Sequence, residues 1–305
     1  MRTHGRLTLA ALLLLASVSL SASVQKIGPD LYAYISDNDS SANATFLMTG
    51  QGVLVVDAGL NAAEGKKLLA EIRKLSPVPV RYLVNTHYHA DHTGGDAVVG
   101  NDAIFFSTEF TRTRISGKKA LPHLPASAWI TFPHSVTLYL GGHQVEIYHP
   151  GPAHTLGDVV VYFPDEHAIA TGDLFLTNSC PAMDDGDLEN WIKALDQILA
   201  LPVEHVVPGH FELATKKEVQ RFRNYLESVR IQVSRMYQAG LSLEQIKQRL
   251  ALQSYRDFRQ FPKYKATFAD NAATYYGQLE KHAHDSPENL RHEERLNGRV
   301  RKKER

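Results

Sequence analysis

The sequence predicts an α/β fold, with two stacked sheets or one large sheet, followed by a helical extension. Short strand-like runs alternate with helix-like periodicity through residue 210, and the pattern becomes almost purely helical after Thr215. The chain has 305 residues, enough for about two units of the usual domain size. With 43% hydrophobic and 22% charged residues, it is predicted to be globular, neither disordered nor a polytopic membrane protein.

The predicted elements follow from periodicity and from the turn residues between them. Apolar positions at Leu68, Leu69, Ile72 and Leu75 have helical spacing, and Pro77 stops that helix. Short apolar or alternating runs bounded by polar and Gly-rich turns are predicted strands. The strands are expected at 31–35, 45–48, 53–56, 81–84, 103–106, 136–140, 145–148, 159–163, 168–170 and 204–207. The helices are expected at 62–75, 188–199, 216–238, 243–250 and 266–283.

The two ends of the chain are predicted to lie outside the fold. Arg2 and Arg6 precede an apolar run over 7–18 and a cluster of small residues, which is typical of a signal peptide. We expect cleavage near residues 21–23 and a periplasmic or secreted protein, with an uncleaved anchor as the alternative. The remaining divisions are an α/β domain over 24–214, a helical subdomain over 215–283 and a disordered mixed-charge tail over 284–305.

Charge and cysteine content exclude several classes of function. Lys+Arg and Asp+Glu are equal at 33 each, so we expect no nucleic-acid partner, and no stable membrane anchor is expected either. The single cysteine, Cys180, excludes cysteine-based zinc modules, iron–sulfur clusters and internal disulfides. The 15 histidines leave metal binding by imidazole open.

A cluster of ligand-type residues follows the predicted strand 81–84. Side chains two apart on an extended segment project to the same side, so His87 and His89 can bind one ion together. Asp91 and His92 come next, where the chain turns, and could face a second ion. Gly94 and Gly95 then allow a tight bend, so the cluster predicts a metal site.

Three more candidates sit on loops that leave strands. His154 lies in a Pro- and Gly-rich turn between two predicted strands, Asp173 follows strand 168–170, and His210 follows strand 204–207. Catalytic zinc takes about three protein ligands and keeps an open position. The candidates therefore suffice for two ions that share one carboxylate.

These residues carry a resemblance to a known family. The His-x-His-x-Asp-His run at 87–92, then His154, Asp173 and Pro208-Gly209-His210, resemble in kind and order the metallo-β-lactamase superfamily of metal-dependent hydrolases, over about residues 25 to 215. The resemblance implies an αββα sandwich and a hydrolase domain over 24–214. It implies two Zn²⁺ ions, with Fe or Mn as possible replacements. By position, His87, His89 and His154 would bind the first ion, Asp91, His92 and His210 the second, and Asp173 would bridge them.

The expected reaction is hydrolysis of a small-molecule substrate. We expect an exported enzyme that cleaves a carbonyl-centred bond (ester, lactone, thioester or β-lactam amide) with a hydroxide bridging two metals. Asp91 and His210 are its catalytic candidates, and Asp91 could orient the nucleophile or accept its proton. One alternative is a β-lactamase proper, although most of these carry Cys or Ser where Asp173 stands. A persulfide dioxygenase with one iron and a non-enzymatic metal-binding protein are alternatives of other classes.

The surroundings of the site are predicted less directly. Asp57, in an Asp-x-Gly run, is expected to brace the histidine loop, and an ordinary turn Asp before Gly59 is the alternative. His149 is expected to support the ligands, and Phe175 and Asn178 to line the substrate pocket. Trp191 is expected in the core rather than against substrate. The helical extension could cap the cleft or mediate dimerisation, and the oligomeric state is left open.

Overall fold

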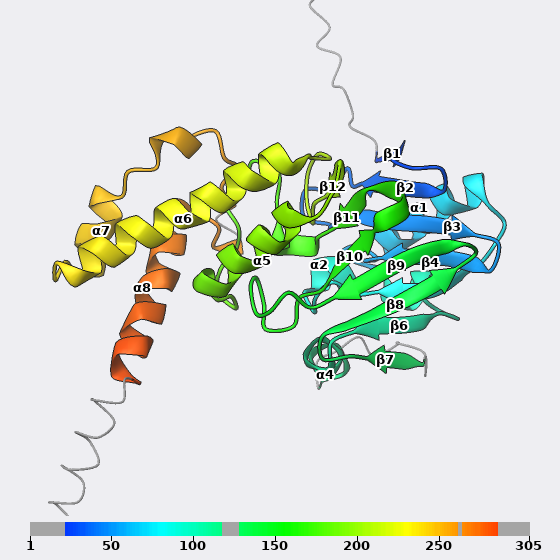
Figure 1. Cartoon of the computed structure of the whole chain (residues 1–305), viewed down its shortest axis with the longest axis horizontal. Coiled ribbons are helices and arrows are strands. Elements are labelled where there is room, and N and C mark those ends of the chain that lie inside the picture. The colour runs from blue at the N-terminus through cyan, green and yellow to red at the C-terminus, as the bar shows by residue number, and fades with distance from the viewer. Residues whose placement is uncertain (1–21, 118–127, 262–263, 286–305) are drawn as a thin grey trace, which may run out of the picture.

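The computed structural model describes residues 22–117, 128–261 and 264–285, and shows two β-sheets packed face to face (Figure 1). The first sheet has seven strands in the order β1 to β7, antiparallel from β1 to β4 and parallel from β4 to β7. Its strands are β1 Ser23–Lys26, β2 Leu31–Ile35, β3 Ala44–Thr49, β4 Gly52–Val56, β5 Val80–Val84, β6 Ile104–Ser107 and β7 Trp129–Thr131.

The second sheet has five strands in the order β12-β11-β10-β9-β8. All neighbours in it are antiparallel except β11 and β12, which run parallel. Its strands are β8 Ser135–Leu140, β9 His143–Tyr148, β10 Val160–Phe163, β11 Ala168–Ala170 and β12 His205–Val207. The helices are α1 Ala62–Leu75, α2 Ala90–Thr93, α3 Asp96–Val99, α4 Glu109–Ser116, α5 Leu188–Ala200, α6 Lys216–Gln238, α7 Leu243–Arg249 and α8 Phe268–His284, with 3₁₀ turns η1 Pro164–Glu166, η2 Gly172–Leu174 and η3 Gln253–Tyr255.

Three buried apolar clusters correspond to the three interfaces of a four-layer αββα sandwich. Leu68 and Ile72 of α1 pack with Phe46 on the outer face of the first sheet. Leu47 and Val161 belong to the cluster between the two sheets. The third cluster lies on the outer face of the second sheet, where α5 packs. This arrangement confirms the predicted fold class.

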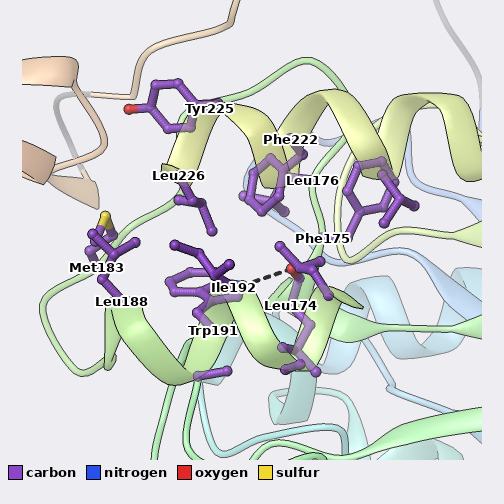
Figure 2. Packing of buried hydrophobic residues seen from close by; sticks show 14 of the residues in the cluster. Leu174, Phe175, Leu176, Met183, Leu188, Trp191, Ile192, Phe222, Tyr225 and Leu226 are labelled. Carbon is purple, nitrogen blue, oxygen red and sulfur yellow. Dashed lines mark hydrogen bonds between the residues drawn. The ribbon is translucent and has the colours of Figure 1, made fainter. Parts of the chain in front are cut away.

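The third cluster continues without a break into the helical extension. Trp191 and Leu195 of α5 share it with Phe222 and Val229 of α6 (Figure 2). Thr215 caps α6 together with Glu218, each side chain accepting a hydrogen bond from the backbone N–H of the other residue. The extension is therefore packed on the sandwich through a common core. Within the described ranges, no helix is both long and apolar enough to span a bilayer.

Several elements were not predicted. The exposed β1 has no apolar pattern and is held by pairing with β2. The helices α2 and α3 have four residues each, too short to show periodicity, and α4 and β7 were also missed. The predicted signal peptide falls almost wholly on residues 1–21, outside the described part. The predicted tail lies outside it too, apart from His284, which still belongs to α8, and Asp285.

Candidate metal centre

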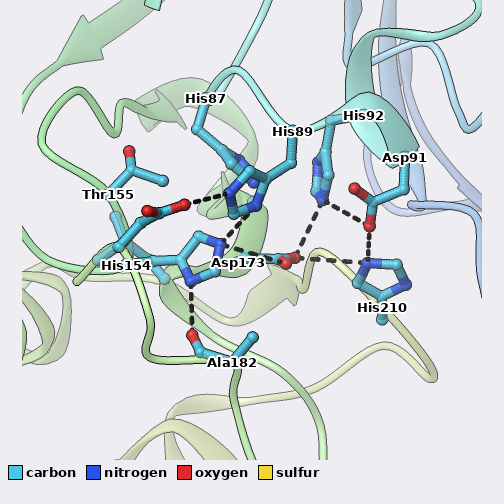
Figure 3. Close-up of polar contacts among 12 residues, drawn as sticks. His87, His89, Asp91, His92, His154, Thr155, Asp173, Ala182 and His210 are labelled. Atoms are coloured by element: carbon cyan, nitrogen blue, oxygen red, sulfur yellow. Dashed lines mark hydrogen bonds and ion pairs between the residues drawn. The ribbon is translucent and has the colours of Figure 1, made fainter. Parts of the chain in front are cut away.

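The predicted ligands converge on loops that follow strands of the two sheets (Figure 3). His87 and His89 follow β5, and His89 is the N-cap of α2, so Asp91 lies in the first turn of that helix. His154 lies in the loop between β9 and β10, Asp173 in η2 after β11, and His210 after β12. The tertiary structure thus brings together residues that are up to 123 positions apart, a separation given by 210 − 87.

The seven side chains form two groups that share one carboxylate. Within each group, one potential ligand atom per residue lies within 4.8 Å of every other. Asp173 faces both, since its Oδ1 is 3.1 Å from His92 Nε2 and its Oδ2 is 3.6 Å from His154 Nε2. The two groups are His87, His89, His154 and Asp173, and Asp91, His92, Asp173 and His210.

The contacts inside the two groups indicate that a cation binds between the side chains. His89 Nδ1 and His154 Nε2 face each other at 3.0 Å, and His210 Nε2 lies 3.1 Å from Asp91 Oδ2. His87 Nε2 is buried and has no hydrogen-bond partner among the described residues. His92 Nε2 and Asp173 Oδ1 are also buried and form no hydrogen bond, although they face each other at 3.1 Å. Unpaired buried polar atoms are costly, and metal ions would pair them. The residues therefore fit a two-metal site.

The electrostatics of the histidines agree with this fit. Burial, with a contribution from His92 and His89, lowers the pKa of His87 well below its usual range. Burial also lowers the pKa of His154 to about 4, so both rings are neutral near pH 7, as metal ligands must be. Burial opposes a charged His92, but Asp173, Asp57 and Asp91 outweigh it and raise the pKa of His92 well above its usual range. The same carboxylates would attract a metal cation in place of that proton.

Asp57 holds the loop that carries His87, His89 and His92 through hydrogen bonds. Its backbone has φ 59°, and its carboxylate accepts hydrogen bonds from Thr86 N at 2.9 Å and Thr86 Oγ1 at 2.7 Å. His92 Nδ1 lies 2.7 Å from Asp57 Oδ2 and donates to it. This bond leaves His92 Nε2 for the centre and sets the orientation of the ring.

The glycines around the centre allow neighbouring backbone and side-chain atoms to approach closely. A Cβ at Gly94 would lie 1.9 Å from Leu60 O, and a Cβ at Gly95 would lie 2.1 Å from Ala58 O. Gly209 is similar, since its Cβ would meet Asp173 Oδ1 at 2.0 Å. The expected bend at Gly94 and Gly95 is thus a steric requirement, because neither residue has a positive φ.

A further carboxylate beside the centre, Asp185, was missed from the sequence. Tyr88 OH donates to Asp185 Oδ2, and His89 Nε2 lies 3.2 Å from the same oxygen. Although burial opposes it, the hydrogen bonds from Tyr88 and His89 lower the pKa of Asp185, so the carboxylate stays charged. Asp185 therefore orients His89 with Nδ1 toward the centre. Nothing in the local sequence marks Asp185, because the contact depends on how the loop after η2 folds back.

A cavity of about 370 Å³ opens over the two groups. Its floor includes His89, Asp91 and Asp173, and its outer part comes from several other segments. Among these, the turn before α8 supplies Phe261 and Ala266, so the extension forms part of the wall. The remaining lining residues are Asp39, Ala90, His154, Ala182, Asp184, Asp185, His210, Phe211, Tyr264 and Lys265.

Two predicted pocket residues lie elsewhere. Phe175 is fully buried and packs edge-on against Phe222, so it is a core residue. Asn178 accepts a hydrogen bond from Arg221 Nη1 at 2.8 Å, pointing into the junction with the extension. Both follow Asp173 in sequence, but the chain turns away from the cavity after η2. The expectation for these two residues was wrong.

Among the described residues, His149 forms no hydrogen bond to the side chain of a candidate ligand. Its Nδ1 donates to Asp158 O at 2.6 Å, in the loop that carries His154. Trp191 lies in the core as expected, where its Nε1 donates to Leu174 O at 2.9 Å. The Trp191 ring also lies against the His154 ring, with centroids 5.3 Å apart.

Comparisons with known proteins agree with the fold. One relative, "Metallo-beta-lactamase type 2" of Elizabethkingia meningoseptica, is 27% identical over 208 residues, covering 65% of this chain and 82% of that protein. The structure of a metallo-beta-lactamase from Pontibacter korlensis has 25% identity and a TM-score of 0.60, covering 68% of this chain and 99% of that one.

A third comparison reaches into the extension. The structure of the inverting sec-alkylsulfatase Pisa1 from Pseudomonas sp. has 15% identity and a TM-score of 0.69, and it covers 88% of this chain. This chain spans about half of that protein, 52%, and at 15% identity the likeness concerns the fold alone.

The family itself is shown by the sequence profile of the metallo-beta-lactamase superfamily, which matches residues 37–210. That range contains both ligand groups and ends on His210. The chain is a metal-dependent hydrolase and belongs to the metallo-beta-lactamase superfamily.

Proposed function

We propose that this hydrolase binds two metal ions, preferentially zinc, and cleaves a carbonyl-centred bond in an ester, lactone, thioester or β-lactam amide. The observation that carries the proposal is the pair of ligand groups joined by Asp173 at the floor of the cavity. The set contains only nitrogen and oxygen donors, which suit Zn²⁺ and also Fe or Mn. Metals bound there would supply Lewis-acid polarisation of a carbonyl group and activation of water.

The chain's own residues would position the reactants. The Asp91 carboxylate lines the cavity, and its side chain is 17% exposed, so it can accept a hydrogen bond or a proton from water in the cavity. His210 Nε2 lies 3.1 Å from Asp91 Oδ2 and restricts the orientation of that carboxylate. Asp57 and Asp185 hold His92 and His89 from outside the two groups.

The test is a substrate panel on the full chain reconstituted with zinc. It contains a chromogenic cephalosporin, an acyl-homoserine lactone, a thioester, a carboxylic ester, a phosphodiester and an alkyl sulfate. The alkyl sulfate is included because the fold neighbour that also covers the extension is an alkylsulfatase. Turnover of one or more carbonyl substrates supports the proposal, and turnover of only the phosphodiester or only the sulfate refutes it.

The panel also separates the β-lactamase alternative, since the relative from Elizabethkingia meningoseptica is named as a metallo-beta-lactamase. Turnover of the cephalosporin alone would restrict the function to a β-lactamase. Both ligand groups are complete here, which favours two metals over the single iron of a dioxygenase. Iron in the isolated protein with oxygen uptake on a persulfide would overturn the hydrolytic reaction.

We also propose that the protein is exported, as the N-terminal arginines and apolar run suggest. Cell fractionation and N-terminal sequencing of the mature protein test this. A cytoplasmic protein with an intact N-terminus would contradict it.

A further inference from the structure

The outer part of the cavity contains an aromatic wall made by two distant segments. Phe211 follows the ligand His210 directly, and Phe261 belongs to the turn before α8. Their rings are stacked, with centroids 5.2 Å apart and an interplanar angle of 10°. Both residues line the cavity, so the wall stands beside the ligand groups.

Phe211 occupies a backbone conformation that favours glycine. Its φ is 73°, and a bulky residue in this region is strained. The surrounding structure enforces the conformation, because Asn43 Nδ2 donates to Phe211 O at 2.7 Å and the Arg259 guanidinium lies 4.4 Å from the ring centroid. A glycine would adopt this backbone without strain. What the strained residue adds is the phenyl ring in the cavity.

Phe261 is fixed to the same loops from the side of the extension. Phe261 and Ala266 exchange two backbone hydrogen bonds, from Phe261 N to Ala266 O and from Ala266 N to Phe261 O, each 3.0 Å. Nearby, Cys180 N donates to Arg259 O at 2.9 Å, and Arg259 pairs with Glu212. These contacts join the turn to the segments that follow Asp173 and His210. The wall is therefore preorganised.

We infer that Phe211 and Phe261 determine specificity by binding an apolar group of the substrate, an aromatic ring or an alkyl chain of several carbons, next to the scissile bond. Aromatic side chains bury a large apolar area, and a cavity of about 370 Å³ has room for such a group. The charged rim residues, Asp39, Asp184, Asp185 and Lys265, lack such a surface. The inference rests on the proposed function for the position of the scissile bond.

The experiment measures binding, so it does not depend on turnover. Acetohydroxamate and octanohydroxamate are titrated by calorimetry into the zinc-reconstituted full chain. Since each buried methylene contributes to affinity, octanohydroxamate is expected to bind at least about tenfold more tightly. In Phe261→Ala this ratio is expected to fall to about threefold or less. The matched control is Phe268→Ala, which removes a ring of the same subdomain that packs on Tyr225 outside the cavity, and it should keep the ratio.

A second variant separates the ring from the stability of the fold. Phe211→Gly removes the ring and relieves the positive φ, and this relief offsets part of the stability lost with the contacts of the ring, so the variant should fold and bind zinc while the affinity ratio drops. An unchanged ratio in both Phe261→Ala and Phe211→Gly, with normal metal content, would overturn the inference. Failure of the proposed function would look different, with no carbonyl turnover but a ratio that still responds to both variants.

Discussion

The inner and outer halves of the cavity differ in origin. The inner half consists of polar side chains on short loops that follow the sandwich strands, and four of its ligands lie within six residues, 87–92. The outer half combines residues after Asp173 and His210 with a turn of the helical extension. The two halves therefore come from different parts of the chain, the inner one from loops of the sandwich and the outer one partly from the helical extension. Variants that act on only one half test this division.

The largest effect is expected from Asp173→Ala, because Asp173 belongs to both ligand groups. Metal binding to both groups should be weakened at once, and since metal catalysis contributes several kcal/mol, activity should fall by about a thousandfold or more. His210→Ala should mainly empty the group that contains Asp91. Metal analysis of both variants, with Asp102→Ala as an exposed control, checks this. Equal occupancies in the two variants would contradict the shared role of Asp173.

The next largest effect on metal binding is expected from Asp57→Ala, which leaves every candidate ligand in place. Loss of the carboxylate leaves His92 Nδ1 and Thr86 N without their partner, at a cost of about 1–3 kcal/mol for each buried group. Metal affinity should fall by about 10- to 100-fold. Competition with a chelator and thermal unfolding measure the two effects. If Asp57→Ala binds metal as tightly as the wild type, the hydrogen bonds of Asp57 do not contribute to metal affinity, and the residue serves only the turn.

A smaller loss is expected from Gly209→Ala. The added Cβ would lie 2.0 Å from Asp173 Oδ1, so the carboxylate must move, and metal affinity should fall by about tenfold. Gly50→Ala is the control, since no atom lies within 4 Å of its added Cβ and its φ is not positive. If both variants bind metal like the wild type, the approach of Gly209 to Asp173 does not constrain the inner half.

The smallest effect is expected from Glu212→Gln, next to Phe211 of the outer half. Glu212 pairs with Arg259, and with side chains 62% and 39% exposed the pair should contribute about 0–1 kcal/mol to stability. Arg259 lowers the pKa of Glu212, so this contribution is present at neutral pH and is lost as the pH falls through that lowered pKa. The free energies of unfolding of the wild type and of Glu212→Gln, measured at pH 7 and at pH 3, test this. They should differ at pH 7 and agree more closely at pH 3. Metal content should stay unchanged, and a loss of metal would show that the halves are coupled.

The accuracy of the sequence predictions follows the same division. Repeated apolar spacing predicted α1, α5, α6 and most strands, because burial of one face imposes a period on the sequence. Elements of four residues such as α2 carry no such period. The positions of Phe175 and Asn178 were wrong because proximity to Asp173 in sequence does not determine the direction of the chain after η2.

The sequence by itself determined the layered α/β class and the chemistry of the ligands, since periodic burial and closely spaced His and Asp residues are local properties of the chain. Only the tertiary structure decided that Asp173 faces both ligand groups and that Asp185 meets His89. It alone placed Phe261 of the extension against Phe211. These contacts join segments far apart in the chain, and their geometry depends on how the layers pack and where each loop turns.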